Sequence, residues 1–250
     1  MSELPSPGPR RISDAARALL ARRAGMIRDA GPRRGAAADS APLSSQQLGQ
    51  WLSGELSLSG VPGALPKTLH LEGPLDRDAL RRALTEIARR HEILRTVFAQ
   101  RNGEPVQQVM PPREVDLSEV DLRRLPAAER TGTAREVLDR DARRPFDLGK
   151  DLLMRAVLVQ LDDQAYEFQA TFEHVAFDGW SNGVFLRELG VLYSAFAAGK
   201  DSPLEELPLQ YADFAVWERT RETTPAFLAD RSYWAQQVAG STTEIGRAHV

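Results

Sequence analysis

The sequence has no cysteine. This absence excludes disulfide bonds, thiolate metal ligands and cysteine nucleophiles, and it is compatible with a reducing cytoplasm. The chain also lacks an uninterrupted apolar run long enough to span a bilayer, and its N-terminus lacks the apolar core of a signal peptide. We therefore expect a cytoplasmic protein with no membrane partner.

The net charge is small and histidines are few. The 32 Lys and Arg residues nearly balance the 35 Asp and Glu residues, and the net charge of -3 gives no basic field of the kind that binds nucleic acid. Hydrophobic residues make up 42% of the chain, as in ordinary globular proteins. Any histidine chemistry must come from His70, His91, His174 or His249.

Composition divides the chain into an N-terminal extension and a folded domain. Residues 1–41 combine a Pro- and Ser-rich beginning, helical spacing over Ile12–Ile27 and a linker rich in Gly, Pro, Arg and Ala. We expect this segment to be a disordered or helical extension and linker. Folded structure should begin near Pro42, with Ser44 or Ser45 capping a short helix.

Periodicity then predicts a mixture of strands and helices that do not alternate strictly, which favours an α/β sandwich over a doubly wound parallel sheet. The expected strands are Thr68–Glu72, Leu94–Ala99, Val106–Met110 after a turn at Gly103, Leu152–Leu161 and Ala165–His174. The expected helices are one capped by Asp76 and running to His91, a charged one over Leu117–Arg144, and three over Asn182–Ala198, Tyr211–Arg221 and from Thr224 onward.

The last seven residues, 244–250, are set apart by a possible back-translation. They can be back-translated to a DNA stretch that looks like read-through into a common sequencing adapter. We therefore expect these residues not to be natural protein, and the native chain to continue past Thr243.

The strand Ala165–His174 carries the main candidate for chemistry. Its period of two places His174 on the same face as the apolar Phe172, and Glu173 on the opposite, polar face. A lone inward histidine is typical of a satisfied core residue. Asp178 and Gly179 follow after a short apolar step, however, and a histidine beside an aspartate where a strand ends is typical of a functional site.

The segment Phe172–Ser181 resembles the His-His-x-x-x-Asp-Gly motif of the condensation domains of nonribosomal peptide synthetases, in the Asp-Gly-Trp-Ser form of peptide-forming members. Four more stretches resemble that family's motifs in the family's order: Pro42–Trp51, Arg90–Phe98, Phe146–Arg155 and Tyr211–Trp217. The resemblance covers about 42–240.

The resemblance implies a chloramphenicol acetyltransferase-like sandwich with two lobes facing each other across a tunnel. Residues 42–200 would be the first lobe, and 201–243 the crossover helices and the start of a truncated second lobe. The implied reaction forms an amide bond between a donor acyl thioester on one carrier domain and an acceptor aminoacyl amine on another. Both would be held on 4'-phosphopantetheine, with no directly bound cofactor and no metal, and an adenylation domain would be a neighbour. The 250-residue chain alone is expected to be inactive.

The resemblance also assigns the catalytic residues. His174 would orient or deprotonate the acceptor amine. Asp178 would shape the loop by pairing with Arg95. Gly179 would let the backbone turn tightly and approach the substrate.

Other residues are expected to support the site. Ser181 should cap the following helix, and Trp180 and Trp217 should be packing residues. Glu173 stands where the family has its first histidine, on the face opposite His174. The residues Arg90–Glu92 are expected at the exposed or capping end of a helix, with a position lining the site as the less favoured alternative.

Three other functions are compatible with some features of the sequence. Gly179–Gly183 fits the Gly-x-Ser-x-Gly elbow of serine hydrolases, but the only later histidine is His249 in the excluded tail, so this function is rejected. A coenzyme A-dependent acyltransferase of the same superfamily stays open, although Asp-Gly-Trp-Ser and Tyr211–Trp217 favour the synthetase. A catalytically degenerate domain that only recruits carriers stays open because of Glu173.

Overall fold

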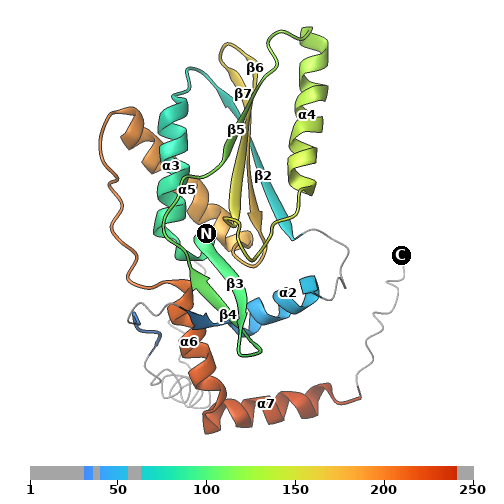
Figure 1. The fold of residues 1–250 in the computed structure, drawn as a ribbon, viewed down its shortest axis with the longest axis vertical. Helices are drawn as coiled ribbons and strands as arrows, with labels where there is room; N and C mark the ends of the chain where they lie inside the picture. Colours follow the sequence, from blue (N-terminus) through green and yellow to red (C-terminus); the bar gives the residue numbers. More distant parts are fainter. Residues whose placement is uncertain (1–30, 36–39, 56–62, 241–250) are drawn as a thin grey trace, which may run out of the picture.

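The computed structural model describes residues 31–35, 40–55 and 63–240 (Figure 1). The helix expected over Ile12–Ile27 in the N-terminal extension and the tail 244–250 lie outside these residues. No helix within the described ranges is long and apolar enough to cross a membrane.

The main sheet has four strands in the order β2-β7-β6-β5. These strands are β2 (Ala64–Glu72), β7 (Ala165–Glu173), β6 (Met154–Asp162) and β5 (Leu117–Asp121). The pairs β2–β7 and β7–β6 are antiparallel, whereas β5 runs parallel to β6. The fold is therefore of the expected α/β class, with a mixed sheet.

Helices cover both faces of this sheet, as Figure 1 shows, with α4 (Ala127–Arg143) on one side and α3 (Arg77–Arg90) and α5 (Gly179–Ala197) on the other. The expected cap of α3 is confirmed, because Asp76 accepts a hydrogen bond from the backbone of Ala79 at 2.9 Å. Leu80, Leu84 and Ile87 repeat at helical spacing and are at most 3% exposed. They pack with Phe168 and Phe172 of β7 in the main core.

A smaller sheet has the order β1-β4-β3. It contains β1 (Ala41–Pro42), β4 (Glu104–Val109) and β3 (Thr96–Arg101), which follows the short helix η1 (Glu92–Arg95). Asn102 and Gly103 form the hairpin turn with φ of 53° and 83°, and this left-handed pair matches the twist of the strands. The remaining helices are α2 (Ser45–Glu55), α6 (Tyr211–Glu222) and α7 (Pro225–Val238).

Two sequence-based assignments were wrong. Leu117–Arg144 was expected to be helical throughout, but its beginning is the edge strand β5. Leu94 was expected in a strand, but it lies in η1 and the strand starts at Thr96.

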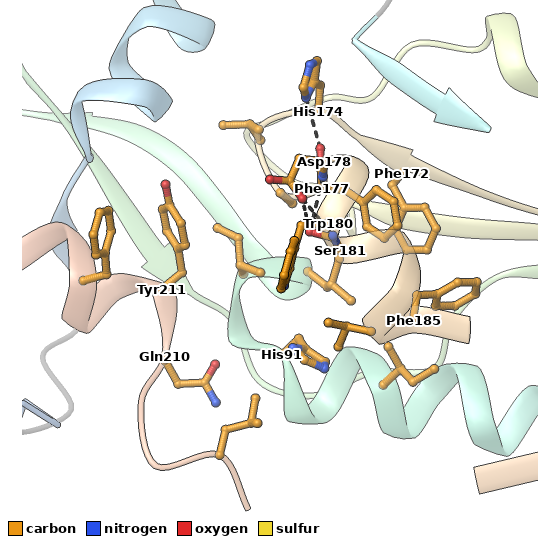
Figure 2. Close-up of a pocket in the computed structure, with 18 of the residues that line it drawn as sticks. His91, Phe172, His174, Phe177, Asp178, Trp180, Ser181, Phe185, Gln210 and Tyr211 are labelled. Atoms are coloured by element: carbon orange, nitrogen blue, oxygen red, sulfur yellow. Dashed lines mark hydrogen bonds between the residues drawn. The ribbon is translucent and has the colours of Figure 1, made fainter. Parts of the chain in front are cut away.

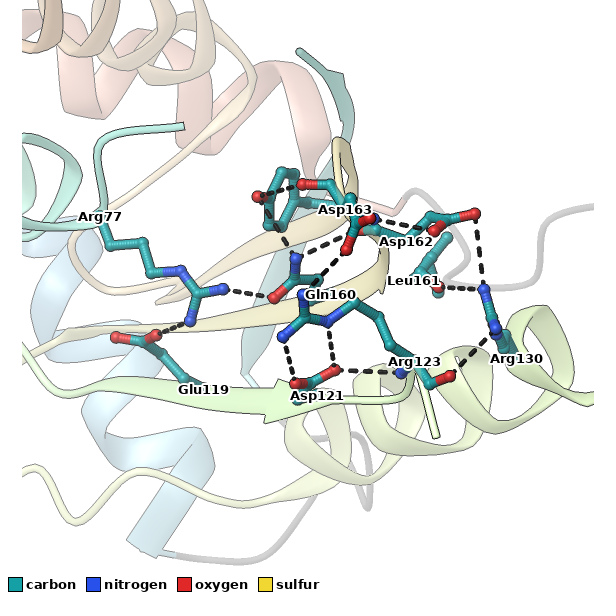
Figure 3. Close-up of polar contacts among 10 residues, drawn as sticks. Arg77, Glu119, Asp121, Arg123, Arg130, Gln160, Leu161, Asp162 and Asp163 are labelled. Carbon is teal, nitrogen blue, oxygen red and sulfur yellow. Dashed lines mark hydrogen bonds and ion pairs between the residues drawn. The ribbon is translucent and has the colours of Figure 1, made fainter. Parts of the chain in front are cut away.

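Long-range contacts explain why β5 is a strand. Arg77 of α3 bonds Glu119 at 2.7 Å, and Arg123 at the end of β5 bonds Asp163 beyond β6 at 2.9 Å (Figure 3). Arg130 of α4 donates to the carbonyls of Leu161 and Arg123 at 2.9 and 3.0 Å. Apart from the bond between Arg130 and Arg123, these contacts join residues 31–42 positions apart, and β5 also pairs with β6, so tertiary pairing overrides local helical propensity.

Candidate active site after strand β7

The loop between β7 and α5 is anchored by aromatic side chains at both ends. The rings of Phe172 and Phe177 stack at 3.9 Å, and Phe185 of α5 meets Phe172 edge-on at 4.9 Å. Val175 is buried in a separate cluster with Leu43 and other apolar residues. Because these apolar residues are fixed in the protein, they hold His174 and Asp178 between them at its surface.

His174 is the first residue after β7, and its side chain is exposed. Its backbone nitrogen donates to Gly63 at 2.7 Å. Its ring Nδ1 lies 3.0 Å from the carbonyl oxygen of Phe177. Since a carbonyl only accepts, Nδ1 carries the hydrogen, and in the neutral ring Nε2 keeps a lone pair that can accept a proton.

The expected inward position of His174 was therefore wrong. The β6–β7 ladder ends with Met154 opposite Phe172, and the β2–β7 ladder ends with Ala64 opposite Glu173. Without a strand partner the backbone turns at residue 174, so the period of two that holds along β7 no longer directs its side chain.

Glu173 was expected to face outward, and this was also wrong. Its side chain is half-buried, and its carboxylate accepts a hydrogen bond from the backbone of Val175. Burial raises the pKa of the Glu173 carboxyl, opposed by that hydrogen bond and by the nearby His174. The face of β7 that carries Gln169 and Thr171 is likewise covered, since both bond to α4.

Asp178 is the N-cap of α5. Its carboxylate accepts from the backbone nitrogen and the hydroxyl of Ser181 at 2.8 and 2.7 Å, and these bonds lower its pKa. The expected pair with Arg95 does not form in the described part of the chain. Arg95 instead donates to the carbonyl of Met110 and lies 3.6 Å from Glu92. Ser181 was expected to be the cap itself, but the N-cap is Asp178, and Ser181 completes the capping box from the third position of the helix.

Gly179 and Trp180 differ from expectation. Gly179 is the first residue of α5 and has no left-handed φ, and an added Cβ would meet nothing within 4 Å, so no tight turn requires glycine here. Trp180 is 86% exposed rather than packed. Trp217 is half-buried, with its ring 5.7 Å from that of Phe214.

A cavity of about 410 Å³ lies beside this loop, between it, the end of α3 and the segment 207–214 (Figure 2). Its volume is within the range of about 300–1,000 Å³ typical of small-molecule sites. Most of its wall is apolar, and the lining residues are Gln46, Ile87, His91, Ile93, Leu94, Phe172, His174, Val175, Ala176, Phe177, Asp178, Trp180, Ser181, Val184, Phe185, Leu207, Leu209, Gln210, Tyr211 and Phe214. The cavity brings together residues from four of the five motif stretches noted in the sequence.

The family model described as "Condensation domain" matches residues 37–246. The chain belongs to the condensation domain family.

Named relatives of this condensation domain include peptide synthetases. The chain is 40% identical over 200 residues to a linear gramicidin synthase protein of Brevibacillus parabrevis, and the match covers 80% of the chain and 4% of that protein. It is 38% identical over 215 residues to phosphinothricin tripeptide synthetase PhsC of Streptomyces viridochromogenes, covering 86% of the chain and 20% of that protein.

Among solved structures, the X-domain from teicoplanin biosynthesis has a TM-score of 0.75 and 29% identity, and it covers 88% of this chain. The first condensation domain of the calcium-dependent antibiotic synthetase, solved with a substrate analogue, has a TM-score of 0.71 and 23% identity, over 85% of this chain. The chain spans about half the length of these solved structures and a small part of the curated relatives.

The expectation for Arg90–Glu92 holds only in part in this condensation domain: His91 is the C-cap of α3, but it also lines the cavity, which was the less favoured alternative. Arg90 is not exposed but 3% accessible, and His91 lines the cavity with Nε2 2.8 Å from the buried carboxylate of Glu188. A signal existed: Glu188 lies at helical spacing among Phe185, Leu189 and Leu192. A carboxylate on the apolar face of a helix indicates a buried partner.

Proposed function

We propose that this domain forms an amide bond between an acyl thioester on one carrier domain and the α-amine of an aminoacyl group on another. The observation that carries the proposal is the hydrogen bond from His174 Nδ1 to Phe177, which leaves Nε2 as a proton acceptor at the wall of the cavity. The peptide synthetases among the relatives support the same reaction class. Membership of the condensation domain family is consistent with both.

In the proposed reaction the neutral amine nitrogen attacks the thioester carbonyl carbon. The proton lost by the nitrogen passes to Nε2 of His174, the carbon–sulfur bond breaks, and the proton is delivered to the departing thiolate. The products are an amide and a free carrier thiol. A positioned general base contributes about 10²–10⁴-fold to such a step. Orientation of the amine by the same nitrogen contributes through proximity.

The substrates would arrive on 4'-phosphopantetheine arms, so the proposed partners are carrier domains and, in the full protein, an adenylation domain. The exposed His174 and Trp180 suggest that further domain structure covers this face during catalysis. We accordingly expect no turnover by the 250-residue chain alone. The cytoplasm is the proposed location, since it would supply the aminoacyl substrates.

The test uses a polypeptide that extends through a complete condensation domain, with donor and acceptor aminoacyl groups loaded on separate carrier domains. His174→Ala should lower the rate of amide formation at least about 100-fold. The melting temperature should stay unchanged because the ring is exposed. His70→Ala, at another exposed histidine, is the matched control and should retain activity. Full activity of His174→Ala would overturn the proposal.

A further inference from the structure

The cavity has a second histidine, on the side away from His174. In the view of Figure 2, Trp180 lies between His174 and His91, which comes from the end of α3. His91 Nε2 lies 2.8 Å from Glu188 Oε2. A carboxylate only accepts, so Nε2 carries a hydrogen. The other ring nitrogen, Nδ1, has no protein partner in the part of the chain that the structure describes.

The Glu188 carboxylate is fixed and charged. Its side chain is 6% exposed, and the same oxygen that meets His91 lies 3.6 Å from Nε of the buried Arg90. Burial opposes ionisation, but the hydrogen bond of His91 and the charge of Arg90 keep the pKa of Glu188 below its ordinary value. The carboxylate therefore holds the imidazole in one orientation and one tautomer, as in other carboxylate–histidine pairs.

Two other polar residues of this part of the cavity wall already form hydrogen bonds within the protein. Gln210 accepts from the backbone of Glu92 at 3.0 Å and donates to the carbonyl of Arg90 at 2.8 Å. The hydroxyl of Tyr211 is bonded to Ser44 at 3.0 Å. Gln46 is exposed. In the neutral ring, His91 Nδ1 is thus the half-buried acceptor that a molecule in the cavity can use.

The rest of the wall suits a flat apolar group. Phe172, Phe177 and Phe185 present an aromatic cluster, and Ile87 and Leu94 add aliphatic surface. A volume of about 410 Å³ exceeds what one aromatic side chain needs and leaves room for the adjoining backbone atoms.

We propose that this cavity binds the side chain of a carrier-bound substrate residue, and that the preferred side chain is aromatic with a hydrogen-bond donor at its tip, accepted by His91 Nδ1. The identification of the ligand as a substrate residue rests on the proposed function, because the cavity reaches His174. A site built to bond a hydroxyl discriminates against analogues that lack it, since its own polar atom is then left unpaired.

The test measures binding rather than turnover. The probes are aminopantetheine amides of tyrosine and of 4-methylphenylalanine, which match in size and differ in the donor at the tip. Isothermal titration of the 250-residue chain should give a Kd for the tyrosyl probe about 5–10-fold lower, the size of one net hydrogen bond. Equal affinities, or no binding of either probe, would overturn the proposal.

Two variants test whether His91 Nδ1 itself, rather than the hydrogen bond between His91 Nε2 and Glu188, causes the preference for the tyrosyl probe. His91→Gln places an amide nitrogen where Nε2 donates to Glu188 but has no counterpart of Nδ1, so it should weaken only the tyrosyl probe and bring the affinity ratio to about 1. His70→Gln, a surface histidine, should leave the ratio unchanged. An unchanged ratio in His91→Gln would contradict the assignment. If that variant does not fold, the ratio in the unmodified chain decides.

The proposed reaction and the proposed side-chain pocket can be disproved independently. A preserved tyrosyl preference with no amide formation in the complete domain would remove the proposed reaction and leave the pocket. Amide formation that depends on His174 but shows no dependence on His91 or on the tip hydroxyl would remove the pocket and leave the reaction.

Discussion

One carboxylate oxygen of Asp178 accepts hydrogen bonds from both the backbone nitrogen and the hydroxyl of Ser181, at 2.8 and 2.7 Å. The backbone nitrogen of Asp178 donates back to that hydroxyl at 3.3 Å. This reciprocal capping box fixes where α5 begins. It therefore also fixes the short loop that holds His174 beside the cavity.

The cap predicts a difference between two substitutions of Asp178. Asp178→Ala should lower the free energy of unfolding by about 1 kcal/mol, since it leaves a helix donor unpaired. Asp178→Asn should cost only a few tenths of a kcal/mol, because asparagine caps helices as well as aspartate does. Urea denaturation of both variants checks this. Equal losses would indicate that the charge of Asp178 matters rather than its cap.

Replacing the half-buried Glu173 by glutamine should stabilise the folded chain at neutral pH but not at acidic pH. Burial raises its folded-state pKa above the ordinary value of 4.5, so the folded state disfavours the carboxylate. The contribution of Glu173 to the stability of the chain should therefore fall as the pH rises from about 4.5 through its folded-state pKa. Glu173→Gln keeps an acceptor for the backbone of Val175 and should be the more stable form at neutral pH, by up to about 1 kcal/mol.

The advantage of Glu173→Gln should vanish below about pH 4.5, where the carboxyl is protonated in both folded and unfolded states. Thermal melts between pH 4 and pH 8 measure the difference. Glu167→Gln is a control on the same face of the same strand. A Glu173→Gln variant that is less stable at neutral pH would show that the carboxylate is favourably bound.

Truncation to alanine should cost much more stability at Phe177 than at Trp180, the two aromatic residues beside His174 and Asp178 in the chain. Phe177 is 5% exposed and stacks on Phe172 at 3.9 Å, so Phe177→Ala should cost about 3–5 kcal/mol. Trp180 is 86% exposed, so Trp180→Ala should change stability by less than about 0.5 kcal/mol. Chemical denaturation of the 250-residue chain separates the two. A large loss for Trp180→Ala would place its ring in the core.

A buried ion pair joins α4 to β6. Arg155 Nε lies 2.9 Å from Asp141, and the two side chains are 6% and 10% exposed. Arg155→Gln should cost about 3–5 kcal/mol, because it removes the buried cation of the Asp141 carboxylate and leaves only the exposed Arg144 at 3.8 Å. The exposed pair of Arg123 and Asp121 provides the comparison, and Arg123→Gln should cost at most about 1 kcal/mol. Similar losses in the two variants, measured by urea denaturation, would contradict the difference in burial.

Much of the local structure followed from nearby residues. The cap of α3 by Asp76, the hairpin at Gly103 and the cap of α7 by Thr224 each depend on contacts within a few positions of the chain. The α/β class and the family were also found from sequence, because five short motifs occur in the family's order. Such features need no knowledge of what lies across the molecule.

The errors share a different cause. The strand over Leu117–Asp121 depends on β6 and on arginines from α3 and α4, and the Glu188 partner of His91 lies 97 residues away. Arg95 was assigned to Asp178 by resemblance, yet its side chain meets Met110 and Glu92. Side-chain pairing across such distances is set by packing geometry, which periodicity does not encode.

The sequence by itself determined the family, the elements with strong local signals and the identity of the histidine at the end of β7. Only the tertiary structure decided that this histidine is exposed, that Glu173 is turned into the protein and that a second histidine lines the same cavity. The physical reason is that alternation along a strand lasts only while neighbouring strands hold the backbone. Where the ladders of β7 end, at Glu173, the surrounding structure sets the direction of each side chain.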